Sequence, residues 1–215
     1  YVDGPVLEIE NSSFIGLHPV PIVYGMTIGE YGKMINGEGW LENKTKANLE
    51  VIRIKNYNHN LRYEPPVRPS PNLPNLQSIY LYPSLAFLEK TEVSVGRGTK
   101  IQFQIYGHPN FISDFSFTPM PNFGSQYPKL KGKLSFGEDL RNYKTKDKIE
   151  LKWLIKSYNQ ISDKTKFFRS DFDKLSGISD LKKQIIEGVS ESLIRESWKD
   201  GLEKFKNIRK KYLLY

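Results

Sequence analysis

The glycine-rich run Ser94-Val-Gly96-Arg97-Gly98-Thr99 is the segment whose residue types best suit chemistry. Two glycines that flank an arginine let the backbone turn sharply and approach a ligand closely. The guanidinium of Arg97 then offers a planar set of donors that suits a carboxylate or a phosphate. No third glycine follows at the spacing of a dinucleotide-binding loop, and the run leads into a predicted strand. The alternative interpretation is a β-turn that carries a surface arginine.

Glu89 follows the apolar residues 85–88, which read as a strand, and precedes the glycine-rich run. We expect its carboxylate to lie within reach of Arg97. There it could act as a general acid or base, or accept a hydrogen bond from a sugar hydroxyl. The alternative is an exposed loop glutamate without a role in catalysis.

His18 and Asn72 are two further polar candidates. His18 precedes a proline in an apolar run, where it could bind a ligand, transfer a proton or make a structural hydrogen bond. Asn72, in the sequence Pro-Ser-Pro-Asn, could offer its amide to a sugar or form an Asx turn. The chain has three histidines without metal-site spacing and no cysteine, so we expect no metal and no cofactor, and thiolate catalysis is excluded.

The N-terminal part predicts one helix and one strand. Thr27 and Glu30 have the spacing of a capping box, apolar residues follow at helical intervals, and Gly37 suits the end of the helix. Residues 49–54 are apolar and β-branched, which predicts a buried strand. A helix followed by a strand is half of an α/β unit. The five prolines of residues 64–74 then indicate an extended crossing segment and a domain boundary.

The C-terminal part predicts short strands and then helices. Aromatic and β-branched residues favour strands at 87–88, 93–95 and 100–106. Apolar spacing indicates helices over 147–158, about 180–187 and about 190–211. The fold class is therefore an α/β part, residues 1–62, followed by a β-rich part closed by C-terminal helices, residues 63–215.

Composition and charge limit the classes of function. The chain of 215 residues is 38% hydrophobic, enough for a core, and it has no apolar run long enough to span a membrane. Its net charge of +8 belongs to residues 129–215, which hold 22 Lys/Arg against 13 Asp/Glu. This excess suits an anionic partner or a solvated surface. Nucleic acid is the less favoured partner, because acidic residues alternate with the lysines of the last helix and no nucleic-acid-binding motif is present.

Several blocks in order resemble one known family. They are His-Pro-Val-Pro-Ile-Val-Tyr-Gly-Met-Thr-Ile-Gly-Glu (18–30), Met-Ile-Asn-Gly-Glu-Gly-Trp-Leu (34–41), Pro-Ser-Pro-Asn-Leu-Pro (69–74), Tyr-Pro-Ser (82–84), Glu-x-Thr-x-x-Ser-x-Gly-Arg-Gly-Thr (89–99) and Arg-Lys-Lys-Tyr-Leu-Leu-Tyr (209–215). The chain resembles the C-terminal half of the NamZ family of exo-β-N-acetylmuramidases, which release N-acetylmuramic acid (MurNAc) from the non-reducing ends of peptidoglycan fragments. The match is most diffuse across residues 107–175.

The resemblance implies a fold and a place for the active site. It implies the end of a Rossmann-like domain followed by a smaller β-rich auxiliary domain, with the active site in the cleft between them. It also implies that the first half of the family protein, with a second catalytic carboxylate, is missing here. The chain starts at Tyr1 without Met or a signal peptide, which fits a piece of a longer protein. A cell-wall substrate in turn implies a periplasmic or secreted protein that serves cell-wall recycling.

Residue by residue, the resemblance implies roles within the same blocks. Glu89 is the candidate catalytic carboxylate, and Arg97 would grip the lactyl carboxylate of MurNAc. Asn72, Ser94, Thr99 and His18 would bind the substrate, Asn72 and Ser94 through hydroxyl or acetamido groups. Lys90 replaces a glycine of the family pattern, and Glu30 is assigned to helix capping. Two other functions stay open, a non-catalytic protein that binds muropeptides or glycans and a nucleic-acid-binding protein.

Overall fold

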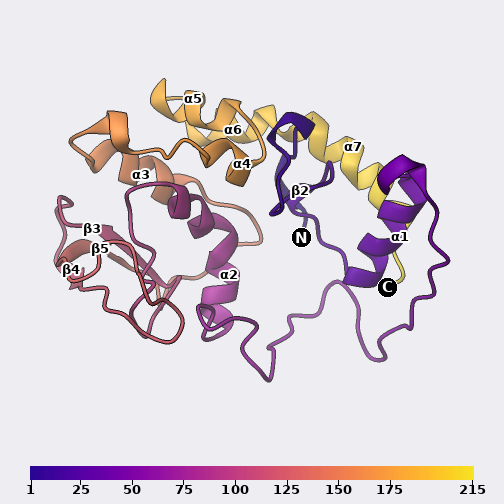
Figure 1. Cartoon of the computed structure of the whole chain (residues 1–215), viewed down its shortest axis with the longest axis horizontal. Helices are drawn as coiled ribbons and strands as arrows, with labels where there is room; N and C mark the ends of the chain where they lie inside the picture. The colour runs from indigo at the N-terminus through magenta and orange to yellow at the C-terminus, as the bar shows by residue number, and fades with distance from the viewer.

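Seven α-helices and two small antiparallel sheets make up the computed structural model, which describes residues 1–215 (Figure 1). The strands are β1 (Asp3–Val6), β2 (Pro21–Val23), β3 (Ile105–His108), β4 (Phe115–Phe117) and β5 (Ser135–Asp139). The helices are α1 (Ile28–Glu38), α2 (Leu76–Leu85), α3 (Lys152–Gln160), α4 (Phe172–Ser176), α5 (Asp180–Ile186), α6 (Glu191–Ser197) and α7 (Lys199–Lys210). Short 3-10 helices lie at Ile9–Asn11, Glu42–Lys44, Ala86–Lys90 and Lys164–Lys166. The predicted mixed α/β class is confirmed.

Helix α1 starts as its sequence predicts. Thr27 and Glu30 form the capping box, in which Glu30 accepts the backbone N–H of Thr27 at 2.8 Å. The helix ends at Gly39, whose φ of 71° is left-handed, and not at Gly37. Gly37 instead lies against the ring of Tyr212, where a Cβ atom would clash.

The strand predicted at residues 49–54 is wrong. This segment has no regular secondary structure and pairs with no strand, and Ile52 is 89% exposed. Strands β1 and β2 pair only with each other, so a β-branched sequence alone has no sheet to join here. The only sheet in residues 1–62 is the antiparallel pair β1-β2, so the expected remnant of a parallel Rossmann-like sheet is not seen there. The boundary at residue 62 stays a prediction.

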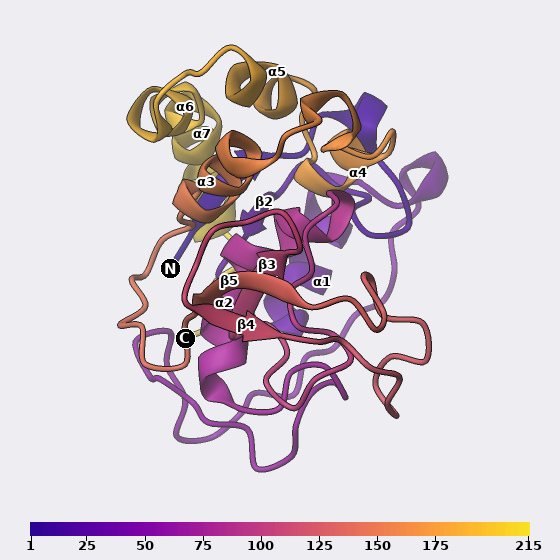
Figure 2. The same cartoon turned by 90° about the vertical axis from the view of Figure 1, so that its left-hand side faces the viewer.

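The C-terminal part holds less sheet than predicted. Its one sheet has the order β3-β5-β4, and Figure 2 shows helices α3, α5 and α6 above it. Residues 87–88 lie in a 3-10 helix that continues α2, and residues 93–95 make only one isolated bridge. Phe103 has a left-handed φ of 54°, which breaks the alternation predicted for 100–106, so β3 starts at Ile105.

The C-terminal helices fit the sequence better. The helix predicted at 147–158 is α3, the one at 180–187 is α5, and the one at 190–211 is divided at Trp198 into α6 and α7. Ile194, Trp198 and Phe205 of this segment are buried, whereas Leu193 is 63% exposed. A core of 24 residues, from Leu81 to Trp198, joins α2 to the sheet and to α3–α6.

Helix α7 returns the chain to its N-terminal part. It packs against β1 and runs toward α1, which lies at the opposite end of the molecule from the sheet (Figure 1). Arg209 donates to the carbonyl of Gly25, and the hydroxyl of Tyr212 donates to Glu38 at 2.6 Å. The C-terminal helix α7 and the residues after it are therefore attached to the N-terminal part of the chain. None of the helices is both long enough and apolar enough to cross a bilayer.

Candidate functional site

Glu89 and Arg97 form an ion pair. Oε2 of Glu89 lies 2.5 Å from Nη2 of Arg97, and the two side chains are 26% and 35% exposed. Glu89 comes from the 3-10 helix after α2, and Arg97 from the glycine-rich turn. The two side chains therefore lie together, as the sequence predicts. Both are partly exposed to solvent, so a polar ligand can reach them.

The glycine-rich turn owes its shape to its small residues. Gly96 and Gly98 have left-handed φ values of 78° and 83°, and a Cβ on Gly96 would lie 2.6 Å from Ile105. Arg97, held between them, has its guanidinium 5.3 Å from the ring centroid of Phe103. The turn thus places the guanidinium of Arg97 against both Phe103 and Glu89.

Ser94 and Thr99 make their hydrogen bonds within this turn. Ser94 is 1% exposed, and its Oγ accepts the N–H of Gly96 at 3.2 Å. The hydroxyl of Thr99 donates to the carbonyl of Gly96 at 2.7 Å and accepts the N–H of Ile101 at 3.1 Å. In this structure both side chains support the backbone that presents Arg97.

Asn72 lies one loop away. It is 7% exposed and donates to the carbonyl of Gly124 at 2.7 Å, while its Oδ1 is buried without a partner. Asn122 of the same loop donates to the carbonyl of Thr99 at 3.0 Å. Asn72 therefore supports a loop that contacts the glycine-rich turn, and it makes no hydrogen bond with Glu89 or Arg97.

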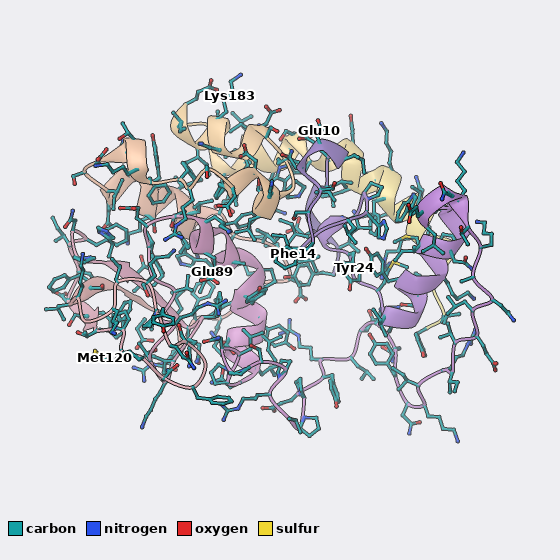
Figure 3. The ribbon with its side chains drawn as sticks, viewed as in Figure 1. Glu10, Phe14, Tyr24, Glu89, Met120 and Lys183 are labelled. Carbon is teal, nitrogen blue, oxygen red and sulfur yellow. The ribbon has the colours of Figure 1, made fainter.

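His18 lies on the wall of a cavity of about 630 Å³. Its ring stacks on Trp40, with centroids 5.5 Å apart, and meets the edge of Tyr31. Burial lowers the pKa of His18, which favours a neutral imidazole. The lining is mainly apolar and comes from residues 5–24, from α1, from α2 and its 3-10 extension, and from α4 with Gly177. Figure 3 shows Phe14 and Tyr24 of this lining between α2 and α1.

The cavity adjoins the ion pair through one aromatic contact. Tyr82 lines the cavity and packs on Phe103, with centroids 4.8 Å apart, and Phe103 is the ring that Arg97 overlies. Glu89 is not part of the lining, although Ala86 and Phe87 just before it are. The structure therefore joins Glu89 and Arg97 directly, whereas His18 lines the cavity and packs on Tyr31 and Trp40.

Lys129 is the residue that sequence reasoning missed. Its ammonium donates to the main-chain carbonyls of the Glu89 segment at distances of 2.6 to 3.2 Å. Burial lowers the pKa of Lys129 to about 7, although the negative charges of Glu89 and Glu92 act in the opposite direction. A lone lysine after a proline carries no sequence signal for such a contact, which only the folded chain creates.

Lys90 and Glu30 have structural surroundings. Lys90 lies in the 3-10 helix and pairs with Asp171, so the site does not need the positive φ that a glycine would allow. Glu30 is fully buried and also accepts the N–H of Leu214 at 2.6 Å and contacts His59 at 3.0 Å. Burial alone would raise the pKa of Glu30, but these hydrogen bonds lower it overall.

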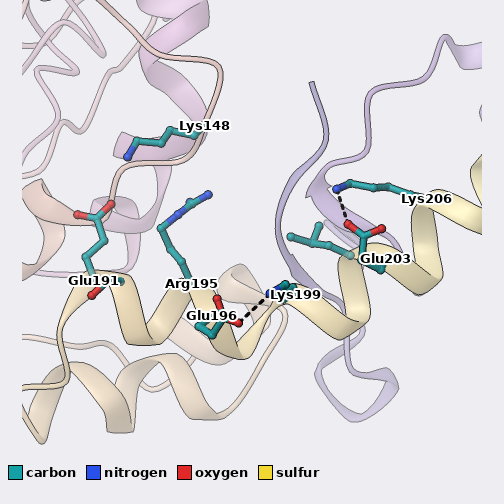
Figure 4. Close-up of a pocket in the computed structure, with 9 residues that line it drawn as sticks. Lys148, Glu191, Arg195, Glu196, Lys199, Glu203 and Lys206 are labelled. Atoms are coloured by element: carbon teal, nitrogen blue, oxygen red, sulfur yellow. Dashed lines mark hydrogen bonds and ion pairs between the residues drawn. The ribbon is translucent and has the colours of Figure 1, made fainter.

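A second cavity of about 590 Å³ lies along α6 and α7 and is lined almost entirely by charged side chains (Figure 4). Glu196 pairs with Lys199 at 3.1 Å, and Glu203 pairs with Lys206 at 2.8 Å. The acidic partners neutralise much of the lysine charge predicted for this surface. No group of three or more His, Asp or Glu side chains is arranged to hold a metal ion.

Comparisons with known proteins cover the whole chain. Residues 1–77 match the family model described as exo-beta-N-acetylmuramidase NamZ, N-terminal, and residues 80–215 match its C-terminal counterpart. The sequence blocks suggested a resemblance to the C-terminal half of the family alone. The N-terminal match shows that the resemblance extends beyond that half. The chain is 33% identical, over 239 residues, to the peptidoglycan beta-N-acetylmuramidase NamZ of Bacillus subtilis (strain 168).

Two crystal structures of DUF1343 family proteins from Bacteroides fragilis are also similar. One is 44% identical with a TM-score of 0.97. The other is 21% identical with a TM-score of 0.78, which shows a shared fold. This chain is covered completely in each comparison, but it spans 56% of the curated relative and 62% of each crystallised chain.

Proposed function

Because this chain belongs to the NamZ family, we propose that it forms one side of the active site of a glycoside hydrolase. The reaction is the release of MurNAc from the non-reducing end of a peptidoglycan fragment. The substrates are saccharides that contain MurNAc linked to N-acetylglucosamine (GlcNAc). The observation that carries the proposal is the Glu89–Arg97 ion pair beside an aromatic-lined cavity.

The two side chains divide the work of binding and reaction. Arg97 uses one terminal nitrogen on Glu89, and its second terminal nitrogen is left for the lactyl carboxylate, which distinguishes MurNAc from GlcNAc. Glu89 supplies one of the two carboxyl groups that flank the bond in glycoside hydrolysis. The turn glycines and Ser94 define the backbone that holds Arg97 beside the carboxylate of Glu89.

The test is release of free MurNAc from a MurNAc–GlcNAc disaccharide by this chain and, in parallel, by the Bacillus subtilis relative. Glu89→Gln in the active protein should lower turnover by at least about 10²-fold, the scale of acid–base catalysis. Glu92→Gln is the matched control, because Glu92 is an exposed carboxylate on the same segment and should retain turnover. Full turnover by the Glu89→Gln variant would exclude Glu89 from the reaction.

A non-catalytic glycan-binding protein is the second candidate. It is favoured by the pairing of Glu89 with a cation, since such a pair can also accept and donate hydrogen bonds to a sugar without cleaving it. Calorimetric titration of the disaccharide into this chain separates the two candidates. Binding without MurNAc release, by this chain and by the relative, would favour the glycan-binding protein.

We also propose a periplasmic or secreted location, because peptidoglycan lies outside the cytoplasm. Cell fractionation with an antibody against the native protein tests this proposal.

The nucleic-acid alternative is less supported, because acidic side chains neutralise lysines of the last helix. Glu196 and Glu203 pair with lysines of α7, and Glu38 pairs with Lys211, which follows α7. Salt-dependent binding of random oligonucleotides would restore it.

A further inference from the structure

The side chain of Lys129 enters the segment that carries Glu89 and binds only its main chain. Its Nζ donates to the carbonyl of Thr91 at 2.6 Å and of Val93 at 2.8 Å. It also donates to the carbonyl of Leu88 at 2.9 Å and of Glu89 at 3.2 Å. An ammonium has three donors, so four acceptors take up its whole capacity, with at least one hydrogen shared.

This contact fixes two stretches of backbone at once. Leu88 and Glu89 belong to the last turn of the 3-10 helix, where the carbonyl of Leu88 also accepts the N–H of Thr91 at 3.1 Å and its hydroxyl at 2.8 Å. Thr91 and Val93 begin the irregular segment that leads to the glycine-rich turn. One cation therefore links the helix end that carries Glu89 to the start of the path toward Arg97, on a segment that also makes backbone hydrogen bonds with Phe167 and Arg169.

The loop that provides Lys129 is itself tied to the glycine-rich turn. The N–H of Met120 donates to the carbonyl of Gly98 at 2.9 Å. A Cβ on Gly98 would lie 2.7 Å from the ring of Pro128, so the residue before Lys129 already lies against this turn. The loop thus contacts the glycine-rich turn that carries Arg97 at one place and the Glu89 segment at another. It therefore connects the backbone of both members of the ion pair.

We propose that Lys129 is a positioning residue that holds Glu89 and Arg97 in the geometry needed for the reaction. It acts through the main chain and does not touch the substrate. This inference rests on the proposed glycosidase function for its catalytic consequence, but not for the backbone contact itself.

The experiment compares Lys129→Met, which keeps the length of the side chain without its charge, with Lys131→Met. Lys131 is an exposed lysine of the same loop and a matched control. Amide hydrogen exchange of residues 88–95 is measured first, without substrate. Lys129→Met should speed exchange in this segment while β3 and β5 keep their protection, and Lys131→Met should match the unaltered chain.

Turnover provides the second measurement, in the protein that releases MurNAc. A displaced carboxylate should lower kcat by about 10²-fold, with a much smaller change in KM, since misplacement by about 1 Å has this effect. Lys129→Arg, which retains the charge, should recover part of kcat. A merely structural lysine would instead change the folded fraction and leave the kcat of the folded protein unaltered.

The outcomes separate this inference from the proposed function. Equal exchange of residues 88–95 in the two methionine variants would overturn the inference, as would a uniform loss of protection that includes β3 and β5. Unchanged kcat in Lys129→Met would also overturn it. If no protein tested releases MurNAc, the glycosidase proposal fails, and hydrogen exchange still decides whether Lys129 holds the segment.

Discussion

The segments 42–68 and 86–99 both lie mostly outside helices and strands, yet they are held in opposite ways. In residues 86–99 the apolar side chains enter the core, and Leu88 and Val93 are fully buried. In residues 42–68 the comparable side chain of Ile52 stays exposed. Four carbonyls of the first segment accept hydrogen bonds from the ammonium of Lys129, whereas the second segment is tied mainly by a few side chains at its surface. Irregular backbone is therefore well defined here where core packing and hydrogen bonds act together.

The largest difference should come from removing one apolar side chain from each segment. Leu88→Ala should lower the free energy of unfolding by about 2–5 kcal/mol, because it leaves a cavity in the core. Ile52→Ala should change it by less than about 0.5 kcal/mol, as is usual for exposed positions. Urea unfolding of both variants measures the contrast. Similar losses would mean that the exposed segment packs in solution.

Gly96→Ala tests the geometry of the turn. The left-handed φ and the close contact with Ile105 should together lower the free energy of unfolding by more than about 1–2 kcal/mol, the backbone cost alone. Gly188→Ala is the matched control, since Gly188 has a φ of 73° but no atom within 4 Å of its added Cβ. Thermal unfolding compares them, and equal losses would show that the contact with Ile105 carries no weight.

Acid should loosen the exposed segment before the core. The pKa of Glu30 is lowered in the folded chain, so its contribution to stability is present above the usual glutamate pKa and is lost as the pH falls through the folded value. The protection factors of the Leu214 amide and of the amides next to His59 in the exposed segment, corrected for slower intrinsic exchange in acid, should therefore fall on acidification. Glu30→Gln should remove this dependence on pH, and an unchanged pH profile in that variant would contradict it.

The smallest effect is expected at the C-terminal residue. The hydroxyl of Tyr215 accepts the N–H of Ile54 at 2.7 Å. Tyr215→Phe should cost at most about 0.5–1.5 kcal/mol, the net value of one hydrogen bond, and should speed exchange of the Ile54 amide. Tyr1→Phe, at the other end of the chain, provides a comparison for loss of a tyrosine hydroxyl. No change at Ile54 would mean that this contact does not restrain the segment.

The sequence was most informative where structure is local. The capping box of Thr27 and Glu30 needs only residues three apart, and the glycine-flanked Arg97 lies eight residues from Glu89, so both features were predictable. The strands predicted at 49–54 and 93–95 are absent, and this could not be foreseen, because a strand requires a partner that composition does not reveal. Lys129 lies 40 residues from Glu89, and only the tertiary fold brings them together.

The central claim is that Glu89 and Arg97 act as one unit on a MurNAc-containing saccharide. A double-mutant cycle with Glu89→Gln and Arg97→Met, measured as affinity for the MurNAc–GlcNAc disaccharide, tests it most directly. Strong non-additivity is expected, with the double variant losing little more affinity than the weaker-binding single variant. Additive losses, or affinity unchanged in every variant, would contradict it.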